Sequence, residues 1–121
     1  MEKEKKKLPA KEINILVGQS NYTIKFPSTG QLIDIERMKL QLTAGTHKDM
    51  LFGQPSAQQA YLLTATIATF SVLIPQLEKD LNVKSLLELD AFQCKGIVKE
   101  YSEKYYPWFK EWTDAINEDV E

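Results

Sequence analysis

The sequence predicts an α+β fold in which an N-terminal β-hairpin precedes a small bundle of three to four helices. Between residues 12 and 27 apolar and polar residues alternate, which is the period of a strand. From residue 28 onward apolar residues recur at helical spacing, and the runs follow residues that commonly cap helices. The length of 121 residues is enough for one modest core. We therefore expect a charged N-terminal arm over residues 1–11, a single α+β domain over residues 12–117 and an acidic C-terminal tail over residues 118–121.

The hairpin is expected over residues 12–27, with its turn in the cluster of Gly18 to Asn21. An isolated hairpin is only marginally stable, so its apolar face must pack against the rest of the chain. The residues of that face alternate along the two strands: Ile13, Ile15 and Val17, then Tyr22, Ile24 and Phe26.

Four positions match or approximate a capping box, in which the first residue and the one three places later satisfy free backbone N–H groups at a helix start. Each of them precedes an apolar run of helical period, so together they predict four helix starts. The pairs are Ser28 with Gln31, Ser56 with Gln59, Ser85 with Glu88, and Asp90 with Gln93.

The first helix is expected from Thr29 to Ala44, with Gly45 ending it. One apolar stripe faces the core (Leu32, Ile35, Met38 and Leu42), while a second ridge, Ile33 and Leu40, is separated from it by charged residues. This ridge is either covered by the same domain or meets a partner.

Residues 46–55 are expected to form a loop, and its content of Met50, Leu51 and Phe52 is unusually apolar. The loop either folds back on the core or docks on a neighbouring chain.

The second helix, over residues 57–74, lies in a stretch without charges but with polar residues and flanking prolines, which favours a buried helix over a membrane span. Part of this helix is a candidate for coverage by another subunit.

After short segments near residues 76–81 and 85–89, the last helix is expected over residues 91–117. Six of the twelve aromatic residues lie between Tyr101 and Trp112, and most of them fall on one apolar stripe. Pro107 is expected to kink or split this helix because it lacks a backbone donor. Tyr106 falls outside the stripe and is therefore a candidate contact residue.

The residues that usually carry catalysis or bind metals are scarce. The chain has one histidine, His47, and one cysteine, Cys94, which lies on the apolar stripe and is expected to act as a small buried side chain. The five glycines are scattered and form no phosphate-binding loop. We therefore expect no enzyme, no catalytic residues, no metal site and no cofactor.

The net charge of −2 is unevenly distributed, because residues 1–11 are basic, residues 111–121 are acidic, and the segment between them is neutral. A neutral body with a single arginine, Arg37, argues against sequence-specific nucleic-acid readout. The basic arm is either a solvated tail or a contact to an acidic neighbour, through Lys3, Lys5, Lys6 and Lys7.

Two stretches, 18–36 (GQSNYTIKFPSTGQLIDIE) and 67–90 (IATFSVLIPQLEKDLNVKSLLELD), resemble small structural proteins of tailed bacteriophages, especially those of the crAss-like phages. The hairpin followed by a helix is also similar to phage tail assembly chaperones. The first resemblance implies a capsid auxiliary protein that binds and stabilises the major capsid protein shell and is assembled in the host cytoplasm. The second implies a chaperone that coats the tape-measure protein.

A soluble adaptor that binds a host protein is the remaining alternative, and self-association is a further option. The apolar residues appear more numerous than one small core can hide, and such a surplus is typical of interfaces. The candidate interface residues are Ile33, Leu40, Met50, Leu51, Phe52, Tyr106, Trp108 and Trp112.

Overall fold

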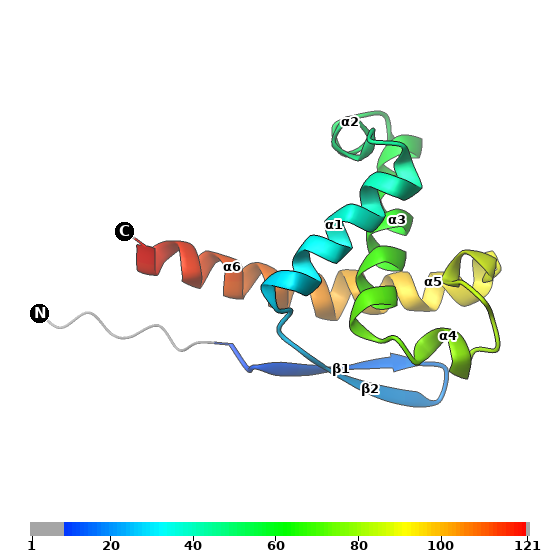
Figure 1. The fold of residues 1–121 in the computed structure, drawn as a ribbon, viewed down its shortest axis with the longest axis horizontal. Coiled ribbons are helices and arrows are strands. Elements are labelled where there is room, and N and C mark those ends of the chain that lie inside the picture. The colour runs from blue at the N-terminus through cyan, green and yellow to red at the C-terminus, as the bar shows by residue number, and fades with distance from the viewer. Residues whose placement is uncertain (1–8, 121) are drawn as a thin grey trace, which may run out of the picture.

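The structure is a computed structural model that describes residues 9–120 (Figure 1). The predicted arm contacts Lys3, Lys5, Lys6 and Lys7 lie outside the described residues. The α+β class is confirmed, because an antiparallel hairpin precedes a set of helices. The elements are β1 (Glu12–Val17), β2 (Ser20–Lys25), α1 (Thr29–Thr43), α2 (His47–Leu51), α3 (Pro55–Leu73), α4 (Leu77–Asp80), η1 (Leu86–Glu88), α5 (Ala91–Glu100), η2 (Tyr101–Tyr105) and α6 (Tyr106–Val120).

The hairpin pairs β1 with β2 in the register that places Ile15 opposite Tyr22. The turn is tighter than the expected cluster, since only residues 18 and 19 separate the strands, and Gly18 takes a positive φ of 62° there. Ile15 and Ile24 are buried on one face, while Lys25 is exposed on the other. The predicted alternation of buried and exposed faces is confirmed.

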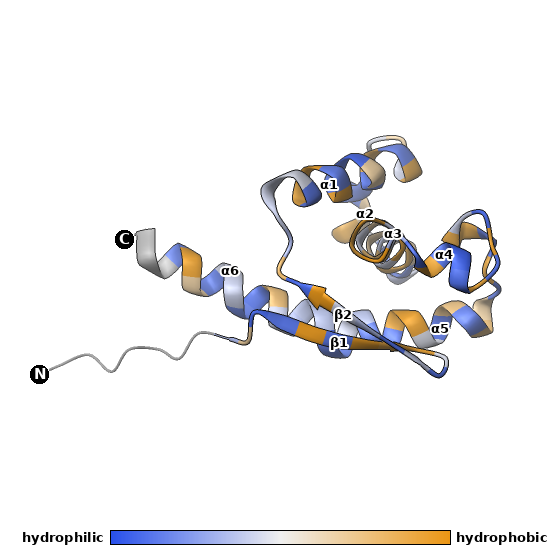
Figure 2. Cartoon of the chain, turned by 60° about the horizontal axis from the view of Figure 1, so that its bottom comes forward, coloured by the Kyte–Doolittle hydropathy of each residue, from blue (hydrophilic) through white to orange (hydrophobic). Residues whose placement is uncertain are grey.

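The core lies where α3 passes between α1 on one side and the hairpin with the long C-terminal helix on the other (Figure 2). Phe70 of α3 is fully buried at its centre and meets the rings of Tyr101 and Tyr105 edge-on, at centroid distances of 6.0 and 6.2 Å. Such edge-to-face pairs add to the stabilisation that comes from burying the rings.

The chain stays helical through Pro107, so the long C-terminal helix does not end there. The residues just before the proline form η2, a π-helical turn in which the Tyr106 N–H donates to the carbonyl of Tyr101, five residues earlier. A π-helical turn widens the helix locally, which accommodates a residue that has no backbone donor. The predicted perturbation is therefore a wider turn rather than a break.

The segment predicted as a loop over residues 46–55 contains a short helix, α2, and this part of the prediction is wrong. Helix α1 ends through Ala44 and Gly45, both at positive φ, and α2 begins two residues later. The short helix packs against α1 and α3. The eleven residues between α1 and α3 leave room for a short helix, and α2 begins without a side-chain cap.

Helix α3 begins at Pro55, whose fixed φ suits the first helical position. Ser56 therefore lies inside the helix, and its predicted capping box is wrong. From Ala60 to Ile74 every residue is buried or half-buried, as expected for a helix without a polar face, whereas its first turn is exposed. Within residues 9–120, no helix is both long enough and apolar enough to cross a membrane.

The capping boxes at Ser28 and Asp90 are confirmed. We expect that removing the second cap, with Asp90→Ala, lowers the free energy of unfolding by about 1 kcal/mol. Its carboxylate accepts a hydrogen bond from the Gln93 N–H at 2.9 Å, and the Gln93 side chain accepts one from the Asp90 N–H at 3.2 Å. Ser56→Ala is the matched control and should be nearly neutral, because Ser56 caps no helix. Urea unfolding of both variants measures the difference, and equal losses would contradict the assignment.

Glu100 joins the hairpin to the C-terminal helix, and its charge should make stability fall in acid. Partial burial acts to raise the pKa of Glu100, but hydrogen bonds from Lys104 (2.8 Å) and from the Leu16 N–H (2.6 Å) hold it below its usual value. The stabilisation is therefore complete above the unfolded pKa of about 4.3 and is lost as the pH falls through the lower folded pKa.

We expect the free energy of unfolding of Glu100→Gln to fall less between about pH 4.3 and lower pH than that of the parent chain does, because one carboxylate with a lowered pKa has been removed. The measurement is urea unfolding across the acid range. If the free energy of unfolding depends on pH in the same way in both chains, the contacts of Glu100 do not stabilise the fold.

Candidate protein-binding surface

The second ridge of α1 is exposed, so it is not covered by the described part of this chain. Ile33 and Leu40 point outward and line a shallow groove of about 430 Å³ on α1. Glu36 and Arg37 border this groove, which gives it an apolar floor and a charged rim. The two predicted residues thus lie together on the outer face of the first long helix.

A second groove joins the α2 region to the C-terminal helix. It has a volume of about 330 Å³, and Leu51 of α2 and Tyr106 of α6 both line it, together with Tyr61 of α3. The side chains of Leu51 and Tyr106 are 43% and 51% exposed. The fold therefore brings together two predicted contact residues that are 55 positions apart in the sequence. We call this the Leu51–Tyr106 groove.

The apolar residues around α2 are divided between the core and the solvent. Met50 is half-buried, whereas Phe52 is 84% exposed. The segment thus folds back on the core at Met50, whereas docking of the exposed Phe52 on a neighbouring chain stays a prediction. An exposed phenylalanine beside an apolar groove is typical of an interface anchor.

Trp108 lies in the chain's own core and is only 6% exposed, so it does not belong to the exposed surface. Trp112 is half-buried against Phe26, with ring centroids 5.5 Å apart. Both indoles donate to the carbonyl oxygen of Ala10, at 2.6 and 2.9 Å. The aromatic stripe is thus largely a core layer that holds the start of the hairpin, and we omit Trp108 from the candidate surface.

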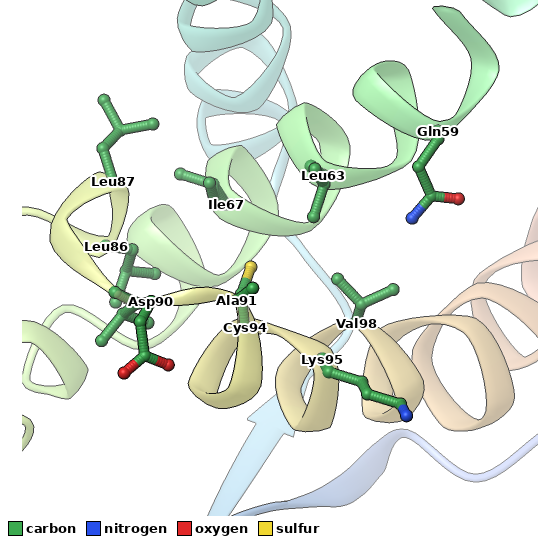
Figure 3. A pocket seen from close by; sticks show the side chains of 11 residues that line it. Gln59, Leu63, Ile67, Leu86, Leu87, Asp90, Ala91, Cys94, Lys95 and Val98 are labelled. Carbon is green, nitrogen blue, oxygen red and sulfur yellow. The ribbon is translucent and has the colours of Figure 1, made fainter. Parts of the chain in front are cut away.

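The sequence reasoning missed a third groove, which lies between α3 and α5 and has a volume of about 400 Å³ (Figure 3). Leu63 and Ile67 line it from α3, and Val98 lines it from α5. Leu87 also lines it and is exposed, and Phe92 near the start of α5 is 89% exposed. Phe92 lies outside the apolar stripe of the C-terminal helix. In the sequence, this position was the only signal that could have identified Phe92 as an exposed apolar residue.

Cys94 lies in this third groove, on the side of α5 that faces α3 (Figure 3). Burial raises the pKa of the Cys94 thiol above its ordinary value. A thiol with a raised pKa carries little reactive thiolate at neutral pH. Cys94 is half-buried, whereas its place on the stripe predicted a buried side chain.

His47 is buried at the start of α2, in the segment that was predicted to be a loop. Its Nε2 lies 4.0 Å from a carboxylate oxygen of Glu36, and its Nδ1 has no hydrogen-bond partner among the described residues. No group of histidine, cysteine and acidic side chains that could hold a metal ion occurs in residues 9–120.

No protein-family model, curated protein or solved structure matches this chain. The geometry of the exposed apolar side chains is therefore the main structural basis for a functional proposal.

Proposed function

We propose that this protein is a non-enzymatic structural protein of a tailed bacteriophage, and that as a capsid auxiliary protein it binds and stabilises the major capsid protein shell. The observation that carries the protein-binding role is the Leu51–Tyr106 groove, together with the exposed Phe52 that follows Leu51 in the chain. The viral setting rests on the resemblance of residues 18–36 and 67–90 to small structural proteins of crAss-like phages.

Physical reasoning supports a protein partner for this groove. Leaving an exposed phenylalanine and a half-exposed tyrosine in water forgoes the free energy that burial of their apolar area provides, at about 25 cal/mol per Å². Aromatic anchors beside a shallow pocket are the features that dominate the binding energy of protein–protein interfaces. A groove of about 330 Å³ accommodates one or two side chains of such a partner.

Charge also fits a neutral protein surface better than a polyanion. None of the seven residues that line the groove is charged: Leu51, Gln58, Tyr61, Leu62, Tyr101, Ser102 and Tyr106. Binding to a phosphate backbone would need a cluster of basic side chains at the contact. The partner that fits this groove is therefore an apolar segment of another protein subunit.

The proposal is tested by mixing the purified chain with shells assembled from the major capsid protein of the phage that encodes it and sedimenting them. We expect the chain to sediment with the shells until a fixed ratio is reached. A chain that stays in the supernatant while it binds purified tape-measure protein would replace the proposal with the tail-chaperone alternative. Binding to neither would overturn both viral roles.

A further inference from the structure

The start of the hairpin is held against the C-terminal helix at one point. The carbonyl oxygen of Ala10 accepts hydrogen bonds from both Trp108 Nε1 and Trp112 Nε1, at 2.6 and 2.9 Å. Two donors on successive turns of α6 fix the position of this one carbonyl. Residues 1–8 are therefore attached to a point beside α6.

A second contact fixes the direction in which the chain runs. Six residues after Ala10, the Leu16 N–H donates to Glu100 at 2.6 Å, and Glu100 precedes the two tryptophans in the C-terminal helix. The hairpin strand β1 thus runs antiparallel to this helix. Followed backward from Ala10, the chain is directed toward the C-terminal end of α6, which projects beyond the hairpin (Figure 1).

An apolar groove lies at this end of the helix and has a volume of about 700 Å³. Phe26, Trp112 and Ile116 form its apolar part, and Ile116 is exposed. Lys11, Glu12 and Lys25 line the groove from the hairpin side. On the helix, Glu111 and Asp114 are exposed, and Asp114 is paired with Lys110 at 2.9 Å. The sequence continues with Glu118, Asp119 and Glu121, and residues 111–121 contain no basic residue.

We propose that residues 1–8 of the same chain bind along this end of α6 as a strap, with Leu8 in the apolar groove and Lys5, Lys6 and Lys7 beside the acidic residues. Leu8 is two residues from Ala10, a span of at most about 7 Å, and Ile116 is one helical turn, or about 6 Å, beyond Trp112. An extended chain therefore allows Leu8 to reach the level of Ile116.

The strap is also long enough to cover the acidic end. Eight extended residues span up to about 26 Å, whereas α6 rises about 12 Å between Trp112 and Val120. Exposed ion pairs are individually weak and are screened by salt, so the charges alone hold the strap loosely. Attachment at Ala10 compensates for this weakness, because it keeps the basic residues at a high effective concentration beside the helix.

Disulfide trapping in the full-length chain tests the strap. In a Cys94→Ser background, Lys7→Cys is combined with Asn117→Cys on α6 or, as the matched control, with Lys25→Cys on β2. Lys25 is exposed and lines the same groove from the hairpin side, so an arm without a preferred site reaches both positions. We expect the pair on α6 to form its intramolecular disulfide about tenfold faster than the control pair, equivalent to about 1.4 kcal/mol.

Salt and a strap variant extend the test. At about 0.5 M NaCl, and separately with Leu8→Ser, the rate advantage should fall severalfold, because the first screens the charges and the second removes the apolar anchor. Equal rates for the two pairs at low salt would overturn the proposal. Disulfide-linked dimers in place of linked monomers would also overturn it, because they would assign the groove to the arm of a second copy.

Discussion

We expect Phe70→Ala to lower the free energy of unfolding by about 3–5 kcal/mol, the range observed when a buried phenylalanine is truncated. Phe70 is fully buried in α3, and its ring contacts Tyr101 and Tyr105 edge-on. The substitution removes the apolar contact area and leaves a cavity at the point where α3 meets the C-terminal helix. Because small domains are stable by only about 5–15 kcal/mol, this one change should remove a large part of the total.

The measurement is urea unfolding followed by tryptophan fluorescence, since Trp108 reports on the same core. Phe92→Ala is the matched control, because it makes the same chemical change at a side chain that is 89% exposed. Phe92→Ala should change the free energy of unfolding by less than about 0.5 kcal/mol. A small effect of Phe70→Ala, comparable with that of the control, would show that the core is not arranged around Phe70.

We expect Tyr106→Ala to weaken binding of the chain to capsid shells by about 30-fold, the loss that corresponds to about 2 kcal/mol at an interface hot spot. Tyr106 is half-exposed and lines the Leu51–Tyr106 groove, so its truncation should remove contact area without opening the core. The affinity is measured by sedimentation of the chain with shells at increasing concentration, and the fold is checked by urea unfolding.

Two further variants define the surface. Leu51→Ala should also weaken binding, because Leu51 lines the same groove. Phe92→Ala should leave binding unchanged, because Phe92 lies at the start of α5 and does not line this groove. The reverse pattern, with binding lost in Phe92→Ala and retained in Tyr106→Ala, would move the interface to the surface around the start of α5.

Local signals in the sequence predicted most of the fold. The alternating pattern identified the hairpin and its buried face, and the residue pairs at Ser28 and Asp90 marked two helix starts that form complete capping boxes. These features depend on neighbours within a few residues. The wrong cap at Ser56 has a local cause as well, since Pro55 already supplies a favourable first residue for α3.

The candidate surface was less predictable, because exposure depends on which elements meet. The aromatic stripe was read correctly as apolar, but only the packing of the hairpin shows that Trp108 is buried by contacts to the chain itself. Conversely, Phe92 is exposed although it is a large apolar residue. The periodic pattern of one helix does not reveal whether another element of the fold covers a given side chain of that helix.

The most direct test of the proposed role is the copy number of this protein in purified phage particles, measured by quantitative mass spectrometry. The capsid auxiliary role predicts a fixed ratio to the major capsid protein, because each bound copy occupies an equivalent site on the shell. Absence from particles, or a quantity unrelated to that of the major capsid protein, would contradict it.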